Sequence, residues 1–179
     1  MHIRFSSCRG LEIVDSSGIL LGMVIEPLIQ ADTGKILGFY CVPMGAFSLR
    51  NTKYISALDI IHFGTRITIR NEEVICNPEE IIRLQSVLED KRSFLRQKIR
   101  TESGEKIGIC ADVQFDTETM HIEWLFPKKF FKWGDAISIH RVLEVRQNFI
   151  LISNKSKMAE ESSSSIILER AASHIPETS

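Results

Sequence analysis

The stretch VDSSGILLGMV, residues 14–24, decides the fold, because the stretch RTESGEKIGIC at residues 100–110 repeats its pattern. In both stretches a Ser-Gly pair separates two apolar runs, and a second glycine follows four residues later. A constant spacing of 86 residues pairs four glycines, Gly18 with Gly104 and Gly22 with Gly108. Such a repeat predicts that one structural unit occurs twice in the chain.

The repeated glycines favour β-structure. Gly18 and Gly104 suit tight hairpin turns, because glycine reaches positive φ without strain. Gly22 and Gly108 fall inside the next predicted strands, where a glycine usually marks a β-bulge or a sharp bend. Small barrels need such bends to close.

The repeat continues if two short deletions are allowed. A two-residue deletion aligns a turn at residues 32–35, which contains Gly34, with a turn at residues 116–119, which has no glycine. The same alignment pairs Tyr40 with Trp124 and Pro43 with Pro127, and a second two-residue deletion pairs residues 55–56 with 137–138. Strands are expected after the turns and at the end of each half: residues 36–42, 66–74, 120–126 and 148–152.

The short strands and frequent turns predict a mainly β fold with two tandem small β-barrels. Between them, Asn77 as a cap, Pro78 at the first helical position and an apolar stripe predict a short amphipathic helix. The predicted organisation has four parts: a first barrel at residues 1–76, a linker at 77–92, a second barrel at 93–153 and a disordered Ser-rich tail at 154–179. Within the tail, residues 166–172 are either a linear docking motif or a short helix without a role.

The composition is that of an ordinary globular protein, with 44% hydrophobic residues, 25% charged residues and a net charge of −1. This balance argues against binding nucleic acid or membranes through net charge, although not against a local basic patch. The sequence contains no 18-residue apolar run and no signal-peptide pattern. Its four scattered cysteines are expected to be free thiols in a reducing cytoplasm: Cys8, Cys41, Cys76 and Cys110.

No set of residues with the spacing of a known catalytic or cofactor site is found. The five histidines lack metal-ligand spacing, so neither a metal nor another cofactor is expected. Nucleophile, phosphate-loop and dinucleotide motifs are absent, and no small-molecule substrate is expected. Four aspartates near predicted turns are interpreted as caps of the turn backbone: Asp15, Asp32, Asp112 and Asp116.

The most distinctive segment is LFPKKFFKWG, residues 125–134. Its candidate binding residues are three lysines interleaved with three aromatic residues: Lys128, Lys129, Phe130, Phe131, Lys132 and Trp133. This mixture suits nucleic acid, a membrane surface or a protein interface. In the alternative interpretation, Phe130 or Phe131 packs into the barrel and the lysines face water. A second basic cluster follows the predicted helix and suits a solvated face: Lys91, Arg92, Arg96, Lys98 and Arg100.

The glycine-rich stretch at residues 14–24, the turn at Asp32-x-Gly34 and the segment at residues 55–60 together resemble the PRC-barrel family. That family is named after the cytoplasmic part of the photosynthetic reaction centre H subunit, and it includes the C-terminal half of a bacterial ribosome maturation factor. The resemblance covers residues 1–76 and 93–153. The second copy departs from it, with Glu118 in place of the turn glycine and His140-Arg141 in place of Leu58-Asp59.

The resemblance implies a binding scaffold without shared catalytic residues. The first hypothesis is therefore a cytoplasmic, non-enzymatic adaptor for a protein partner. A second is an RNA- or ribosome-associated assembly factor, and a third is a peripheral protein on an anionic membrane surface. An enzyme is the last alternative, because no residues supply a nucleophile, a base or a metal site.

Overall fold

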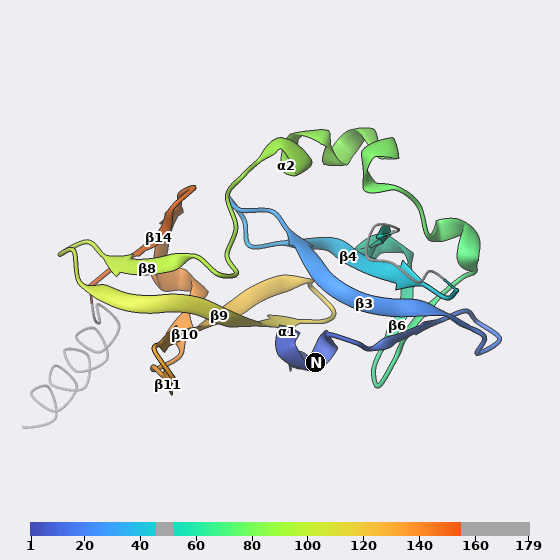
Figure 1. Cartoon of the computed structure of the whole chain (residues 1–179), viewed down its shortest axis with the longest axis horizontal. Coiled ribbons are helices and arrows are strands. Elements are labelled where there is room, and N and C mark those ends of the chain that lie inside the picture. Colours follow the sequence, from blue (N-terminus) through green and yellow to red (C-terminus); the bar gives the residue numbers. More distant parts are fainter. Residues whose placement is uncertain (46–51, 155–179) are drawn as a thin grey trace, which may run out of the picture.

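The computed structural model describes residues 1–45 and 52–154, and it is mainly β, with two sheets, one of them a half-barrel. The first sheet runs in the order β5-β4-β3-β2-β7-β6. Its strands are β2 (Glu12–Val14), β3 (Leu20–Ile29), β4 (Ile36–Pro43), β5 (Lys53–Ser56), β6 (Ile60–Phe63) and β7 (Ile67–Ile69). Figure 1 shows this sheet beside the second one, with the linker arching above the first.

The second sheet follows the order β11-β10-β9-β8-β14-β13, with β1 added to β9 and β12 added to β10. Its strands are β1 (His2–Arg4), β8 (Lys98–Thr101), β9 (Lys106–Asp116), β10 (His121–Lys129), β11 (Lys132–Trp133), β12 (Ile137–Ser138), β13 (Val142–Val145) and β14 (Phe149–Ile152). The helical elements are short: α1 (Phe5–Cys8), η2 (Ala57–Asp59), η3 (Glu72–Val74), η4 (Pro78–Glu80), η5 (Ile82–Leu84), α2 (Gln85–Glu89) and η6 (Ile139–Arg141).

The strand pairing repeats in the two halves, as the sequence predicts. Ile13 pairs with Gly22 in the first sheet, and the residues 86 positions later, Ile99 and Gly108, pair in the second. A register shift lies beside each of these glycines, which confirms the predicted bulges. A Cβ at Gly22 would lie 2.6 Å from the carbonyl oxygen of Val42, so only glycine allows the strands to approach this closely.

The deletion that the sequence alignment placed before β4 is wrong. Leu28 pairs with Gly38 in the first half, and Gln114 pairs with Trp124 in the second, so the spacing is still 86 residues in these strands. Trp124 therefore corresponds to Gly38 and not to Tyr40. The whole deletion falls after β4 and β10. The two hairpin turns have equal length, but Asp32-Thr33 and Asp116-Thr117 occupy different positions in them. Pairing these similar dipeptides therefore produces a false deletion.

The two halves meet at their equivalent hairpin turns. Lys35 and His121, which are 86 residues apart, form an antiparallel bridge with each other. The Ile36 amide donates to the Met120 carbonyl at 2.7 Å, and the equivalent Ile122 amide donates to the Gly34 carbonyl at 3.0 Å. Because each bond is the counterpart of the other, the halves are related by an approximate two-fold axis, like the subunits of an isologous dimer.

One apolar core fills the space between the two sheets. Phe39 and Phe63 from the first sheet contact Phe115 from the second, with ring centroids 6.1 and 5.9 Å away. Phe39 and Phe115 are fully buried. The two β-rich halves that the sequence predicts are therefore present as two sheets, one of them a half-barrel, and they share this core.

The N-terminal segment also joins the halves. β1 pairs with β9 of the second sheet, and Ser6 of α1 contacts Asp112 of β9. The Asp112 carboxylate is 2% exposed and accepts hydrogen bonds from the Ser6 amide and hydroxyl at 3.0 and 2.6 Å. The prediction that Asp112 caps a turn is therefore wrong, because the residue lies inside a long strand and anchors α1.

Two of the other aspartates do cap turns. The Asp15 carboxylate accepts from the Ser17 and Ile19 amides, and the Asp116 carboxylate accepts from the Glu118 amide. A hydrogen bond from the Ser17 hydroxyl, together with these amide bonds, lowers the pKa of the Asp15 carboxyl below the usual value of 3.8. The amide bond from Glu118 likewise lowers the pKa of Asp116. Asp32 lies in its turn but forms an ion pair with Arg92 of the linker.

The linker contains a short helix, although the continuous helix predicted from residue 77 is broken into η4, η5 and α2. Asn77 does not cap the backbone, because its side chain binds Lys53 and Glu80 instead. The apolar stripe nevertheless packs as expected, with Leu84 buried against Leu28 and Tyr54. Packing and not helical propensity shapes such a short segment.

Candidate functional site: the basic aromatic hairpin

Residues 128–133 form a tight hairpin between β10 and β11, and we call it the basic aromatic hairpin. Lys129 pairs with Lys132, which leaves Phe130 and Phe131 as the two turn residues. Phe130 has a φ of +54°, and Phe131 is not among the residues with positive φ. A two-residue hairpin loop usually places glycine at such a first turn position. A phenylalanine there is strained, and backbone strain of this kind clusters at functional sites.

Both turn phenylalanines point into solvent. Phe130 is 89% exposed and Phe131 is 94% exposed, and Trp133 at the base of the hairpin is 54% exposed. The alternative in which one phenylalanine packs into the core is therefore wrong. In Figure 1 the hairpin forms the lower edge of the second half, where β11 is labelled.

A row of paired residues continues from the hairpin across the sheet, and we call it the basic row. Trp133 pairs with Lys128, Lys128 with Ile109, Ile109 with Lys98, and Lys98 with Phe149 of β14. Directly paired residues of neighbouring strands point to the same face of a sheet. The basic row therefore places two lysines between apolar side chains on one partly exposed face.

Cations already cover the aromatic rings of this row. The ammonium of Lys128 lies 5.2 Å from the centroid of the Trp133 ring. The guanidinium groups of Arg100 and Arg146 each lie 5.2 Å from the centroid of Phe149. These cation–π contacts hold positive charge close to the sheet surface.

The equivalent row in the first half has a different character. Its members are Arg66, Glu12, Met23 and Val42, which occupy the positions of Phe149, Lys98, Ile109 and Lys128. Arg66 and Glu12 lie 3.8 Å apart and neutralise each other. The two halves therefore differ in charge on this face.

The second basic cluster predicted from the sequence does not form one patch. Arg92 binds Asp32 and Asp90, and Arg96 binds Glu26 at 2.7 Å. Lys98 belongs to the basic row instead. Arg92 and Arg96 therefore hold the chain between the sheets against the first half, whereas Arg100 lies over Phe149 of the second sheet.

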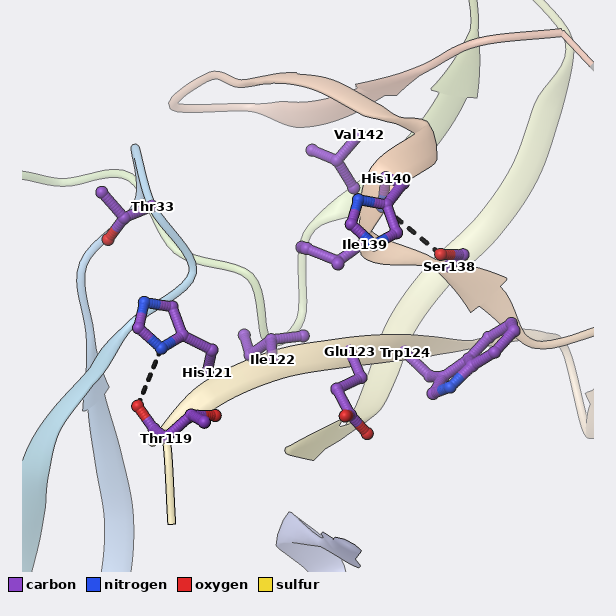
Figure 2. Close-up of a pocket in the computed structure, with 10 residues that line it drawn as sticks. All are labelled: Thr33, Thr119, His121, Ile122, Glu123, Trp124, Ser138, Ile139, His140 and Val142. Carbon is purple, nitrogen blue, oxygen red and sulfur yellow. Dashed lines mark hydrogen bonds between the residues drawn. The ribbon is translucent and has the colours of Figure 1, made fainter. Parts of the chain in front are cut away.

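A groove of about 720 Å³ lies near the contact between the halves, and Figure 2 shows its lining residues. The His121 ring nitrogen Nδ1 lies 2.8 Å from the Thr119 carbonyl, and the Ser138 hydroxyl accepts from the His140 amide at 3.4 Å. Ser138 thus caps η6 in the way that Ser56 caps η2. The His121 ring and the Ser138 hydroxyl therefore have local structural roles in the groove, and His140 takes part through its backbone amide.

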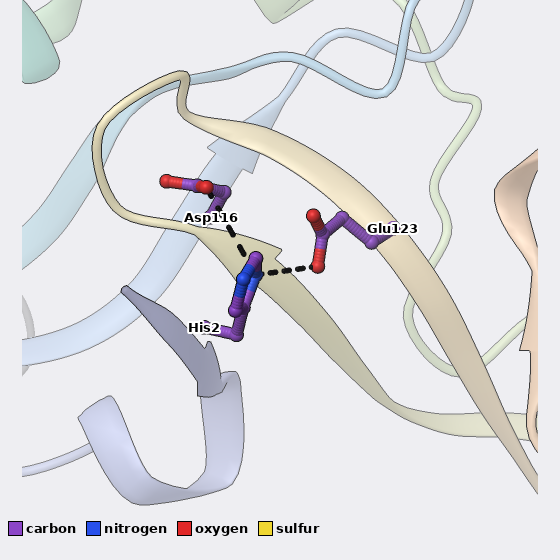
Figure 3. A group of neighbouring side chains, drawn as sticks. All are labelled: His2, Asp116 and Glu123. Atoms are coloured by element: carbon purple, nitrogen blue, oxygen red, sulfur yellow. Dashed lines mark ion pairs between the residues drawn. The ribbon is translucent and has the colours of Figure 1, made fainter.

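Three side chains from different strands meet at the edge of the second sheet: His2, Asp116 and Glu123 (Figure 3). His2 Nδ1 lies 2.8 Å from a Glu123 oxygen and 3.9 Å from an Asp116 oxygen. One nitrogen and two carboxylates can bind a transition metal. Sequence spacing could not indicate this cluster, because strand pairing brings residue 2 beside residue 116. The ion pair with Glu123 and the turn cap at Asp116 account for the contacts without a metal.

All four cysteines are free, and three of them are fully buried: Cys8, Cys41 and Cys110. Burial raises the pKa of each of these three thiols to about 12. They are therefore protonated at neutral pH, and they pack as small apolar residues rather than acting as nucleophiles.

No protein-family model matches the chain, and no curated protein matches it. Across residues 1–45 and 52–154, no helix combines the length and apolar character needed to cross a bilayer. The resemblance to the PRC-barrel family therefore stays a prediction. The basic aromatic hairpin stands out from the rest of the described surface because exposure, charge and backbone strain coincide there.

Proposed function

We propose that this chain is a binding protein whose main contact with its partner is the basic aromatic hairpin. The observation that carries the proposal is the exposure of Phe130 and Phe131, at 89% and 94%, beside three lysines. Adjacent exposed aromatic side chains are typical of interaction sites, and large aromatic residues dominate binding energy.

The strain at Phe130 supports the same proposal. A glycine or asparagine would take a φ of +54° at lower cost. A sequence that keeps phenylalanine at this position gives up stability and gains apolar surface at the tip. A binding role at the tip of the hairpin would explain why this loss of stability is retained.

A binding role also agrees with the state of the other polar groups. The buried thiols are protonated, and the buried Asp112 carboxylate anchors α1. A binding scaffold is also what the resemblance to the PRC-barrel family implies. We therefore prefer a non-enzymatic role in the cytoplasm.

Photo-crosslinking in cells of the source organism tests the proposal. A photoreactive phenylalanine analogue replaces Phe131 in the full chain. The same analogue at Ile82 is the control, because Ile82 is nearly as exposed, at 89%. We expect the Phe131 probe to form a reproducible adduct with a protein, an RNA or a lipid. Equal labelling from both positions would contradict a specific contact through the hairpin.

A further inference from the structure

We infer that the basic aromatic hairpin docks on an anionic lipid bilayer, with Phe130 and Phe131 inserted at the boundary between headgroups and acyl chains. The inference rests on the proposed function, because it names the partner of the same hairpin. It follows from the order of side chains along the hairpin and from their charge.

The tip of the hairpin is apolar. Phe130 and Phe131 are consecutive, and each exposes nearly its whole side chain to water. Because the strands turn there within two residues, both rings can enter a soft apolar phase without any rearrangement of the sheet. Apolar side chains on the leading edge of a surface protein bind membranes through the area they bury.

The residues behind the tip match the next layer of a bilayer. Lys129 and Lys132 form the first pair behind the turn, and Lys128 and Trp133 form the second. Long lysine side chains extend toward phosphate groups while their stems stay near apolar surface. Tryptophan prefers the headgroup region. From the tip backward, the hairpin therefore presents two phenylalanines, then two lysines, then a lysine beside a tryptophan. This order matches the change in polarity from the acyl chains of a bilayer to its headgroups.

The charge of the hairpin selects an anionic surface. None of the ion pairs between described residues includes Lys128, Lys129 or Lys132. The Lys129 ammonium contacts only a backbone carbonyl, that of Lys106, at 3.5 Å, which leaves its charge uncompensated. Uncompensated lysines attract anionic lipid headgroups.

A bilayer fits these observations better than a nucleic acid does. Proteins that bind single strands stack bases on aromatic rings along a basic groove. Here Lys128 already lies over the Trp133 ring, and two arginines lie over Phe149. The two exposed phenylalanines of the hairpin, Phe130 and Phe131, stand at its turn and not along a groove.

Vesicle flotation of the full chain tests the inference, with vesicles of phosphatidylcholine alone or mixed with phosphatidylglycerol. We expect flotation only with the anionic lipid. The double variant Phe130→Gly, Phe131→Ser should lower the partition coefficient by about tenfold or more, since each buried aromatic side chain contributes strongly. The matched control Ile82→Ser should float like the wild type.

Lysine variants and fluorescence give two further measurements. Replacement of Lys128, Lys129 and Lys132 by glutamine should weaken binding by about fivefold per lysine, and added salt should weaken the wild type. In Trp124→Phe, Trp133 is the sole tryptophan, because the chain has 2. Its emission should shift to the blue when anionic vesicles are added.

Absence of flotation at low salt, or flotation of the double variant at the wild-type level, would overturn the inference. So would tight binding of a single-stranded oligoribonucleotide that is lost with the same phenylalanines while vesicles stay unbound. If Phe131 then crosslinks to protein or RNA in cells, the proposed function stands without the membrane. If the probe at Phe131 forms no more adducts than the probe at Ile82, both the proposed binding function and the membrane inference are wrong.

Discussion

Three of the described residues other than glycine adopt a positive φ: Arg96, Met120 and Phe130. For two of them, the equivalent position in the first half is a glycine, which explains this backbone conformation. Arg96 corresponds to Gly10, which has a φ of +84°, and Met120 corresponds to Gly34, which has a φ of +68°. The second half thus keeps the backbone path of the first after losing the glycines. At the same spacing Phe130 corresponds to Met44, which is not among the residues with positive φ, so this strain belongs to the second half alone.

Phe130→Gly should raise the free energy of unfolding by about 0.5–1 kcal/mol, because glycine relieves the positive φ. Phe131→Gly is the matched control. It should lower stability by about 0.5 kcal/mol, because glycine there adds only unfolded-state entropy. Urea unfolding of both variants measures the difference. Equal effects at the two positions would contradict strain at Phe130.

At the scale of elements, the two long hairpins β3-β4 and β9-β10 carry the architecture. Each needs a glycine where its first strand passes the partner strand most closely. A Cβ at Gly22 would lie 2.6 Å from the Val42 carbonyl oxygen, and one at Gly108 would lie 2.7 Å from the Lys128 carbonyl oxygen. Gly108 thereby also fixes the strand that carries the basic aromatic hairpin.

Gly22→Ala and Gly108→Ala should each destabilise the protein by about 1–3 kcal/mol, because backbone must move to admit the methyl group. Gly134→Ala is a milder comparison, since its nearest contact would be a proline side-chain carbon at 3.2 Å. Thermal unfolding of the three variants gives the ranking. A cost at Gly134 as large as at Gly22 would argue against the close approach.

The linker is held by an acid-sensitive contact. Arg92 binds Asp90 and Asp32, and its hydrogen bonds lower the pKa of the Asp90 carboxyl below 3.8. A lowered folded-state pKa contributes stability that is present above the unfolded value and is lost as the pH falls through the folded value. The contact should therefore weaken only below about pH 4.

Asp90→Asn and Arg92→Gln should both flatten the loss of stability between neutral pH and acid, because each removes the same interaction. Urea unfolding at a series of pH values measures this slope. A slope equal to that of the wild type in both variants would show that other carboxyl groups dominate.

At the scale of the whole molecule, the duplicated halves behave as one unit. Phe39, Phe63 and Phe115 form an aromatic contact across the two sheets, and β1 extends from the first half onto the second sheet. Separation of the halves would expose this contact and the paired turns at Lys35 and His121. We therefore expect cooperative unfolding.

Phe115→Ala should lower the free energy of unfolding by about 3–5 kcal/mol through loss of buried contacts and cavity formation. Both tryptophans lie in the second half and both tyrosines in the first, so fluorescence distinguishes the halves. We expect coincident tyrosine and tryptophan transitions in the wild type and the variant. Two separate transitions would show that the halves fold independently.

The sequence by itself determined the mainly β fold, the repeat and the bulges, because Gly18, Gly22 and their counterparts encode local backbone geometry. It also identified the residues of the basic aromatic hairpin. Only the tertiary structure decided the alignment of the halves, their shared core and the exposure of Phe130 and Phe131. These features depend on contacts between residues distant in the sequence, such as Phe39 and Phe115. The local sequence pattern does not specify whether an apolar side chain packs against another element or faces water.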